Sequence, residues 1–80
     1  MKPPKLEPGK KYRVHPGDAS SAVRDIVYDV DSRTLEVEYA SGVRYAYREV
    51  PPEEFLDLLR TDSVGAFVNT RIKQYRYDRL

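Results

Sequence analysis

The sequence predicts a small α+β domain: a three-stranded antiparallel meander packed on one face by two C-terminal helices, with a flexible N-terminal arm. The chain has 80 residues, enough for one small domain. From residue 22 onward, three runs rich in β-branched and aromatic residues alternate between apolar and polar positions, as half-buried strands do. After residue 50, apolar residues recur at helical spacing instead.

The predicted strands are residues 26–30, 35–39 and 43–47. Because neighbouring strands must place their apolar side chains on the same face, we expect Tyr39 to pair with Val43. The three-residue loop between them ends at Gly42, which suits the left-handed position of such a hairpin. In the first hairpin, the same matching pairs Val30 with Leu35.

Two helices are predicted after the strands. A Pro-Pro pair at residues 51–52 ends the third strand and begins a helix, since proline is tolerated in the first turn. The apolar face of this helix consists of Phe55, Leu58 and Leu59. Ser63 is the expected N-cap of a second helix, in which apolar residues keep helical spacing as far as Tyr75.

Residues 1–19 form the predicted arm and residues 20–80 the folded domain. Four of the six prolines lie in the arm, and proline removes a backbone donor. A short edge strand over Tyr12–His15 is the alternative for this segment.

The charge divides unevenly along the chain, although the total is only +1. Residues 1–13 hold five basic and one acidic residue, which gives +4, and residues 71–80 hold four basic and one acidic residue, which gives +3. Residues 14–70 hold five arginines and eleven acidic residues, which gives −6. Basic ends on an acidic body indicate an anionic partner. We expect nucleic acid if the two ends meet on one face, and a protein partner if they lie apart.

The composition excludes several kinds of chemistry. The chain has no Cys and one His, which excludes disulfides, thiol nucleophiles and His-rich metal sites. It has no phosphate-binding glycine motif and no G-x-S-x-G. The segment from His15 to Ser21 contains catalytic residue types, but turn chemistry explains them. We therefore expect no enzymatic activity, no cofactor and no metal. Because no apolar run is long enough for a membrane span or a signal peptide, we expect a cytoplasmic location.

Glu36 and Glu38 share one face of the second strand, as paired catalytic carboxylates would. The predicted register, however, places Arg44 opposite Glu38 and Arg48 diagonal to Glu36. We therefore expect an exposed lattice of ion pairs on the solvent face of the sheet rather than an acid–base site.

Two segments combine positive charge with aromatic rings, and this mixture favours an RNA-binding module because cations neutralise phosphates while rings stack on unpaired bases. The candidate residues of the C-terminal segment are Arg71, Lys73, Tyr75, Arg76, Tyr77 and Arg79. Those of the N-terminal segment are Lys10, Lys11 and Arg13, which flank Tyr12. The alternative is a protein–protein interaction or small regulatory module, with self-association into a dimer as one form of it, because the acidic body would repel nucleic acid.

The order and spacing of several short motifs resemble the KTSC domain over residues 20–80. The motifs are Ser20-Ser21, Tyr28-Asp29, Leu35-Glu36-Val37, Gly42, Tyr45-Ala46-Tyr47, Val50-Pro51, Ser63–Asn69 and Arg71-Ile72. This family is named for its occurrence at the C-terminus of some lysyl-tRNA synthetases, and it also occurs as a small stand-alone bacterial protein. The resemblance implies RNA binding and supplies no catalytic residues.

Within the resembling segment, Ser63, Gly65 and Asn69 are further candidate contacts. Gly65 would allow close packing or the approach of a partner, since glycine inside a helix is otherwise unfavourable. Asn69 would bind either a backbone group or a ligand. Face matching between the strands points Tyr45 and Tyr47 inward, beneath the helices, so we expect both to belong to the core.

Overall fold

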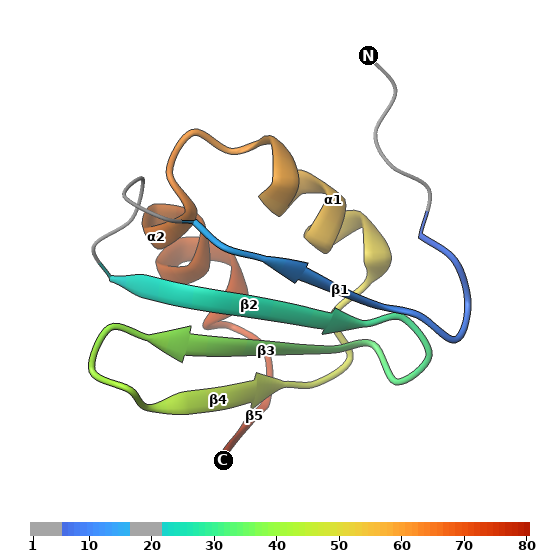
Figure 1. Cartoon of the computed structure of the whole chain (residues 1–80), viewed down its shortest axis with the longest axis horizontal. Coiled ribbons are helices and arrows are strands. Elements are labelled where there is room, and N and C mark those ends of the chain that lie inside the picture. The colour runs from blue at the N-terminus through green and yellow to red at the C-terminus, as the bar shows by residue number, and fades with distance from the viewer. Residues whose placement is uncertain (1–5, 17–21) are drawn as a thin grey trace.

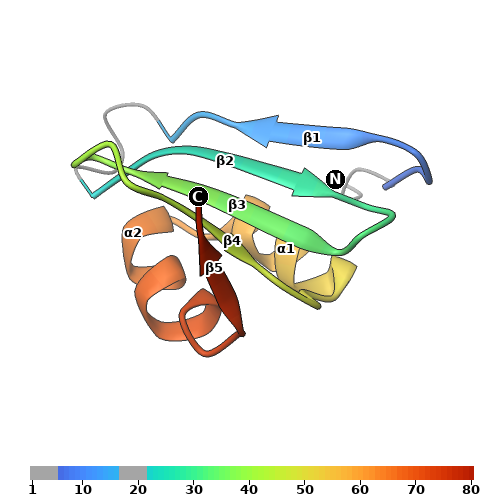
Figure 2. The ribbon, with the colours of Figure 1, turned by 90° about the horizontal axis from the view of Figure 1, so that it is seen from below.

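The computed structural model describes residues 6–16 and 22–80 and shows one antiparallel sheet with helices on one of its faces (Figures 1 and 2). The strands, in their order across the sheet, are β1 (Lys11–Val14), β2 (Val23–Asp29), β3 (Thr34–Tyr39), β4 (Arg44–Tyr47) and β5 (Tyr77–Arg79). The helical segments are α1 (Pro52–Arg60), α2 (Val64–Phe67) and the π-helix η2 (Val68–Ile72). The predicted α+β class is confirmed, but the prediction of three strands is wrong because one further strand lies at each edge.

The first of these additional strands, β1, lies in the segment that we assigned to a flexible arm. Its residues pair antiparallel with β2, with Tyr12 opposite Tyr28 and Val14 opposite Ile26. Tyr12 and Val14 also pack against the core, so the outer edge of β2 gains both backbone partners and apolar cover. The edge strand proposed as the alternative is therefore correct for this part of the arm, while residues 1–5 and 17–21 lie outside the described ranges.

The register of the second hairpin is as predicted. Val37 lies opposite Tyr45, and the N–H of Gly42 donates to the carbonyl of Tyr39. Gly42 has a φ of 92°, which only glycine adopts without strain, and this explains its position at the end of the loop.

The register of the first hairpin differs from the prediction by two residues. Leu35 pairs with Tyr28 rather than with Val30. The side chain of Asp29 explains the difference, because its Oδ1 accepts the N–H groups of Asp31 and Ser32 and turns the chain immediately after β2. A shift of two residues keeps the same side chains on the core face.

The helix α1 begins at Pro52 as predicted, but its apolar face is narrower than expected. Phe55 and Leu58 are buried, whereas Leu59 is 37% exposed. Ser63 caps α2 as predicted, with its Oγ accepting the N–H of Ala66.

The second helix does not continue to Tyr75, as its apolar spacing predicted. It changes to a π-helix at Val68, ends at Ile72, and the chain then turns back to form β5. Pairing with β4 explains the change, since Arg48 donates its N–H to the carbonyl of Arg76 and β4 gains a strand partner.

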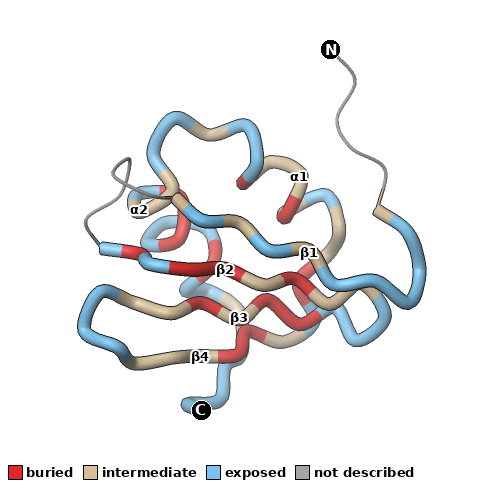
Figure 3. Tube along the Cα trace, in the orientation of Figure 1, coloured by how far each residue is buried: buried red, intermediate tan, exposed pale blue. Residues whose placement is uncertain are grey.

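The core lies between the central strands and the helices (Figure 3). It comprises Val23, Ile26, Tyr28, Leu35, Val37, Tyr47, Val50, Phe55, Leu58, Phe67, Val68 and Ile72. Tyr28 connects the sheet layer of the core with the helix layer. Its ring stacks on Phe55 with 4.9 Å between centroids, and its hydroxyl donates to the carbonyl of Val50 at 2.6 Å.

The opposite face of the sheet carries ion pairs. Arg44 lies 3.0 Å from Glu38 and 3.4 Å from Glu36, which confirms the expected lattice. Arg48 differs from the prediction, because its guanidinium binds Asp78 of β5 and Thr34 rather than approaching Glu36. Both carboxylates of β3 therefore lie within 4.0 Å of an arginine.

We predict that Tyr28→Phe destabilises the fold by about 1–2 kcal/mol, because the buried carbonyl of Val50 loses its hydrogen-bond donor. Urea denaturation of the two proteins measures this difference. Tyr77→Phe, at a residue that is 55% exposed, serves as the control and should change stability by less than about 0.5 kcal/mol. Equal effects of the two substitutions would contradict the structural role of the Tyr28 hydroxyl.

Candidate functional site: a tyrosine pocket

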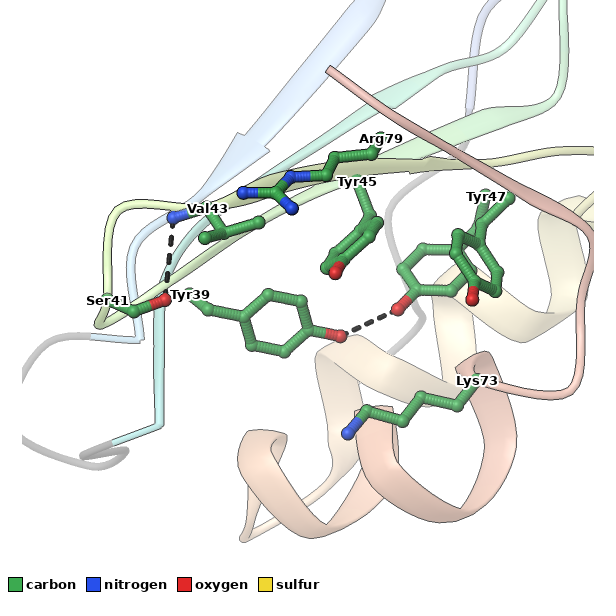
Figure 4. A pocket seen from close by; sticks show the side chains of 8 residues that line it. Tyr39, Ser41, Val43, Tyr45, Tyr47, Lys73 and Arg79 are labelled. Carbon is green, nitrogen blue, oxygen red and sulfur yellow. Dashed lines mark hydrogen bonds between the residues drawn. The ribbon is translucent and has the colours of Figure 1, made fainter.

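A pocket of about 590 Å³ opens on the helix side of the sheet, at the edge formed by β4 and β5 (Figure 4). Its lining residues are Tyr39, Ser41, Val43, Tyr45, Tyr47, Lys73, Tyr77 and Arg79. This volume lies within the range of about 300–1,000 Å³ that is usual for small-molecule sites. The pocket therefore has room for a ligand of that size.

Four tyrosine rings form the apolar part of the pocket, hereafter the tyrosine pocket. The ring of Tyr45 lies edge-to-face with that of Tyr77, with 5.2 Å between centroids and 89° between planes. Tyr45 makes a second edge contact with Tyr39, and Tyr47 lies 5.8 Å from Tyr77. These mutual contacts hold the rings in place, while Tyr77 remains 55% exposed.

The hydroxyls of Tyr39 and Tyr47 are hydrogen-bonded to each other at 2.7 Å. Burial raises the pKa of both hydroxyls above the ordinary value near 10. Both groups are therefore neutral at physiological pH and can donate as well as accept a hydrogen bond.

Two cations lie beside the rings, and they come from different elements. Lys73 follows η2, and its Nζ lies 5.6 Å from the ring centroid of Tyr39. Arg79 lies on β5, and Figure 4 shows its side chain and that of Lys73 on opposite sides of the tyrosines. Among residues 6–16 and 22–80, neither Lys73 nor Arg79 has an ion-pair partner within 4.0 Å. Both cations are available to an anion.

Two of the predicted contacts in the C-terminal segment, Arg71 and Tyr75, bind other side chains of the fold. Arg71 lies 2.6 Å from Oε1 of Glu54 and also contacts Asp57 and the face of Phe67. Tyr75 donates its hydroxyl to Oε2 of Glu54, and burial together with this carboxylate raises the pKa of Tyr75 to about 12. Both residues tie the end of η2 to α1.

The N-terminal candidates do not lie at the pocket, because β1 and β5 are opposite edges of the sheet. Four strand spacings separate these edges, which is about 19 Å. Lys10 lies beside Glu7, and Arg13 and His15 both contact the buried carboxylate of Asp25. The two basic ends therefore do not combine into one surface.

The remaining candidates do not line the pocket. Ser63 is used as a helix cap, and Gly65 lies in α2. Asn69 is exposed on η2, and Arg76 and Lys11 are exposed on the chain before β5 and on β1. None of these five residues belongs to the pocket lining.

Five of the eight lining residues were not predicted as site residues, namely Tyr39, Ser41, Val43, Tyr45 and Tyr47. Face matching placed Tyr45 and Tyr47 on the correct face but predicted both in the core. Tyr47 is indeed 3% exposed, whereas Tyr45 is only partly buried. The apolar–polar alternation of the two strands places Tyr39, Tyr45 and Tyr47 on one face of the sheet. This shared face was the signal in the sequence that indicated a cluster of tyrosines.

Within residues 6–16 and 22–80, no three His, Asp or Glu side chains are grouped as a metal site would require. Across the same ranges, no helix has both the length and the apolar character needed to cross a bilayer.

Comparison with known proteins agrees with the resemblance found in the sequence. The KTSC domain profile matches residues 19–77. An uncharacterized protein of Stutzerimonas stutzeri is 44% identical over 63 residues, which is 76% of this chain and 89% of the relative. A protein of Tsukamurella paurometabola is 44% identical over 54 residues, which is 68% of this chain and 81% of the relative.

A solved structure has the same fold. The crystal structure of a KTSC domain protein from Yersinia pestis superimposes with a TM-score of 0.79 at 26% identity, over 89% of this chain and 99% of that protein.

We predict that Arg71→Ala lowers stability by about 1–2 kcal/mol, because Glu54 keeps only about a tenth of its side chain exposed and loses its cation. Arg79→Ala removes the same charge from the pocket rim and should change stability by less than about 0.5 kcal/mol. Urea denaturation of both variants distinguishes the roles. If Arg71→Ala is as mild as Arg79→Ala, Arg71 does not hold η2 to α1.

Proposed function

This chain belongs to the KTSC domain family, and we propose that it is a non-enzymatic module that binds single-stranded RNA at the tyrosine pocket. The observation that supports this proposal is the convergence of Lys73, Tyr77 and Arg79, three of the predicted RNA contacts, on a pocket with three more tyrosines. Aromatic rings bind unpaired bases and cations bind the backbone, so these side chains suit both parts of a single strand.

The charge at the rim favours this kind of ligand over others. A cage of aromatic rings alone would suit a quaternary ammonium group. Here Lys73 and Arg79 would repel such a cation, and Lys73 already lies near the face of Tyr39. A planar ligand that carries negative charge satisfies both the rings and the cations, and a nucleotide is such a ligand.

The position of the basic ends restricts the proposal to the C-terminal segment. We propose phosphate contacts from Lys73, Arg79 and the nearby exposed Arg76, and none from Lys10, Lys11 or Arg13 at the opposite edge.

The separation of the two ends also favours the alternative function, a protein–protein interaction module. The two basic ends do not form one continuous surface, because the sheet face between them carries acidic residues paired with arginine. Capture of one stoichiometric protein partner, unaffected by nuclease, would support this alternative.

We predict that a fluorescein-labelled uridine decamer binds and that the logarithm of its affinity falls with the logarithm of the salt concentration with a slope of about −2, as three phosphate contacts on a single strand imply. Lys73→Gln and Arg79→Gln should each weaken binding and reduce this slope by about 0.7. Fluorescence anisotropy at several KCl concentrations measures both quantities.

Lys11→Gln is the matched control, because it removes the same charge from an exposed position on β1. It should leave the affinity and the slope unchanged. An absence of decamer binding at low salt would refute the proposed function, and an equal loss in Lys11→Gln would place the contact outside the tyrosine pocket.

A further inference from the structure

The two cations of the tyrosine pocket approach it from opposite sides, one from the end of η2 and one from β5 (Figure 4). We propose that the pocket holds one internal nucleotide of an RNA strand, with its base among the tyrosines, its 5′ and 3′ phosphates on different cations, and the Tyr39 hydroxyl donating to the base. This inference rests on the proposed function and specifies the ligand of its central site.

The rings provide a surface for one base. Tyr77 is held edge-to-face by Tyr45 at 5.2 Å, so its orientation is fixed while more than half of it is exposed. Every base has a flat face, and stacking on a fixed aromatic ring does not depend on which base is present. We therefore expect the base to lie against Tyr77 with little preference among the four bases.

The hydroxyl pair provides one hydrogen-bond donor. Tyr47 is 3% exposed, so its hydroxyl hydrogen must be satisfied within the protein, and the oxygen of Tyr39 lies 2.7 Å away. When Tyr47 donates to Tyr39, the hydrogen of Tyr39 remains available, and Tyr39 is the more exposed of the two. An acceptor atom on the edge of the base can receive it.

The cations provide two separate phosphate contacts. A base inserted into a concave site leaves the phosphates on either side of it at the rim. Lys73 and Arg79 lie at that rim on opposite sides of the rings, and neither is engaged by a carboxylate within the described residues. A site for a terminal nucleotide would need a cation on only one side.

The test compares uridine 3′,5′-bisphosphate with uridine 5′-monophosphate, uridine 3′-monophosphate and ribose 5-phosphate by isothermal titration calorimetry. We expect the bisphosphate to bind at least about threefold more tightly than either monophosphate, as an added exposed charge contact allows. Ribose 5-phosphate should bind about tenfold more weakly than uridine 5′-monophosphate, because it lacks the stacking base.

The variants separate the contacts. The Lys73→Gln variant should bind the bisphosphate no more tightly than it binds one of the two monophosphates. The Arg79→Gln variant should bind the bisphosphate no more tightly than it binds the other monophosphate. Tyr39→Phe should weaken all three uridine nucleotides by a similar factor, about two- to tenfold, since it removes one hydrogen bond to the base. Lys11→Gln, a matched charge change on β1 at the opposite edge of the sheet, should alter none of these values.

The inference is overturned if the bisphosphate binds no more tightly than the monophosphates, if both cation variants lose the same phosphate, or if ribose 5-phosphate binds as well as the nucleotide. An unchanged affinity in Tyr39→Phe overturns the hydroxyl contact. Binding of the uridine decamer without binding of any nucleotide at millimolar concentration overturns this inference alone, whereas failure of the decamer to bind refutes the proposed function.

Discussion

The helical layer of this protein is too short to cover the sheet that it packs on, and the rest of the structure follows from this constraint. Phe55 of α1 packs against Tyr12 of β1 and Tyr28 of β2, so the first helix covers the β1–β2 side. Figure 2 shows the helices below the sheet and β5 at its edge, where Tyr45 is only partly buried and Tyr77 is 55% exposed. Tyrosine suits this uncovered edge because its ring packs against the core while its hydroxyl meets water or a ligand.

The position of the C-terminal segment decides whether that edge becomes a pocket. Arg71 and Tyr75 both bind the carboxylate of Glu54, which attaches the end of η2 to α1. The chain then leaves the helix and pairs with β4, placing Tyr77 beside Tyr45. The ion pair of Arg71 with Glu54 and the added strand thus bring Lys73 and Tyr77 to one site. The residues that line the pocket are therefore different from Arg71, Tyr75 and Glu54, which hold the C-terminal segment in position.

The features that the sequence predicted correctly depend on local chemistry. Gly42 marks the second hairpin loop, Pro52 the start of α1 and Ser63 the cap of α2, and each acts on atoms a few residues away. The motifs that resembled the KTSC domain likewise gave the correct family.

The features that the sequence did not predict depend on distant partners. Strands β1 and β5 form because the edges of β2 and β4 need backbone partners, and nothing within either segment shows that such an edge is near. The helical spacing of residues 64–75 favoured a continuous helix, and tertiary pairing overrode it. The exposure of Tyr45 was missed for the same reason, since it depends on how far the helices extend across the sheet.

The most direct test of the tyrosine pocket is to follow the aromatic NMR signals of the tyrosines while the uridine decamer is added. We expect the signals of Tyr39, Tyr45 and Tyr77 to move during the titration, whereas those of Tyr12 on β1 and Tyr28 in the core stay in place. Movement of the Tyr12 signal with the pocket signals unchanged would contradict this expectation.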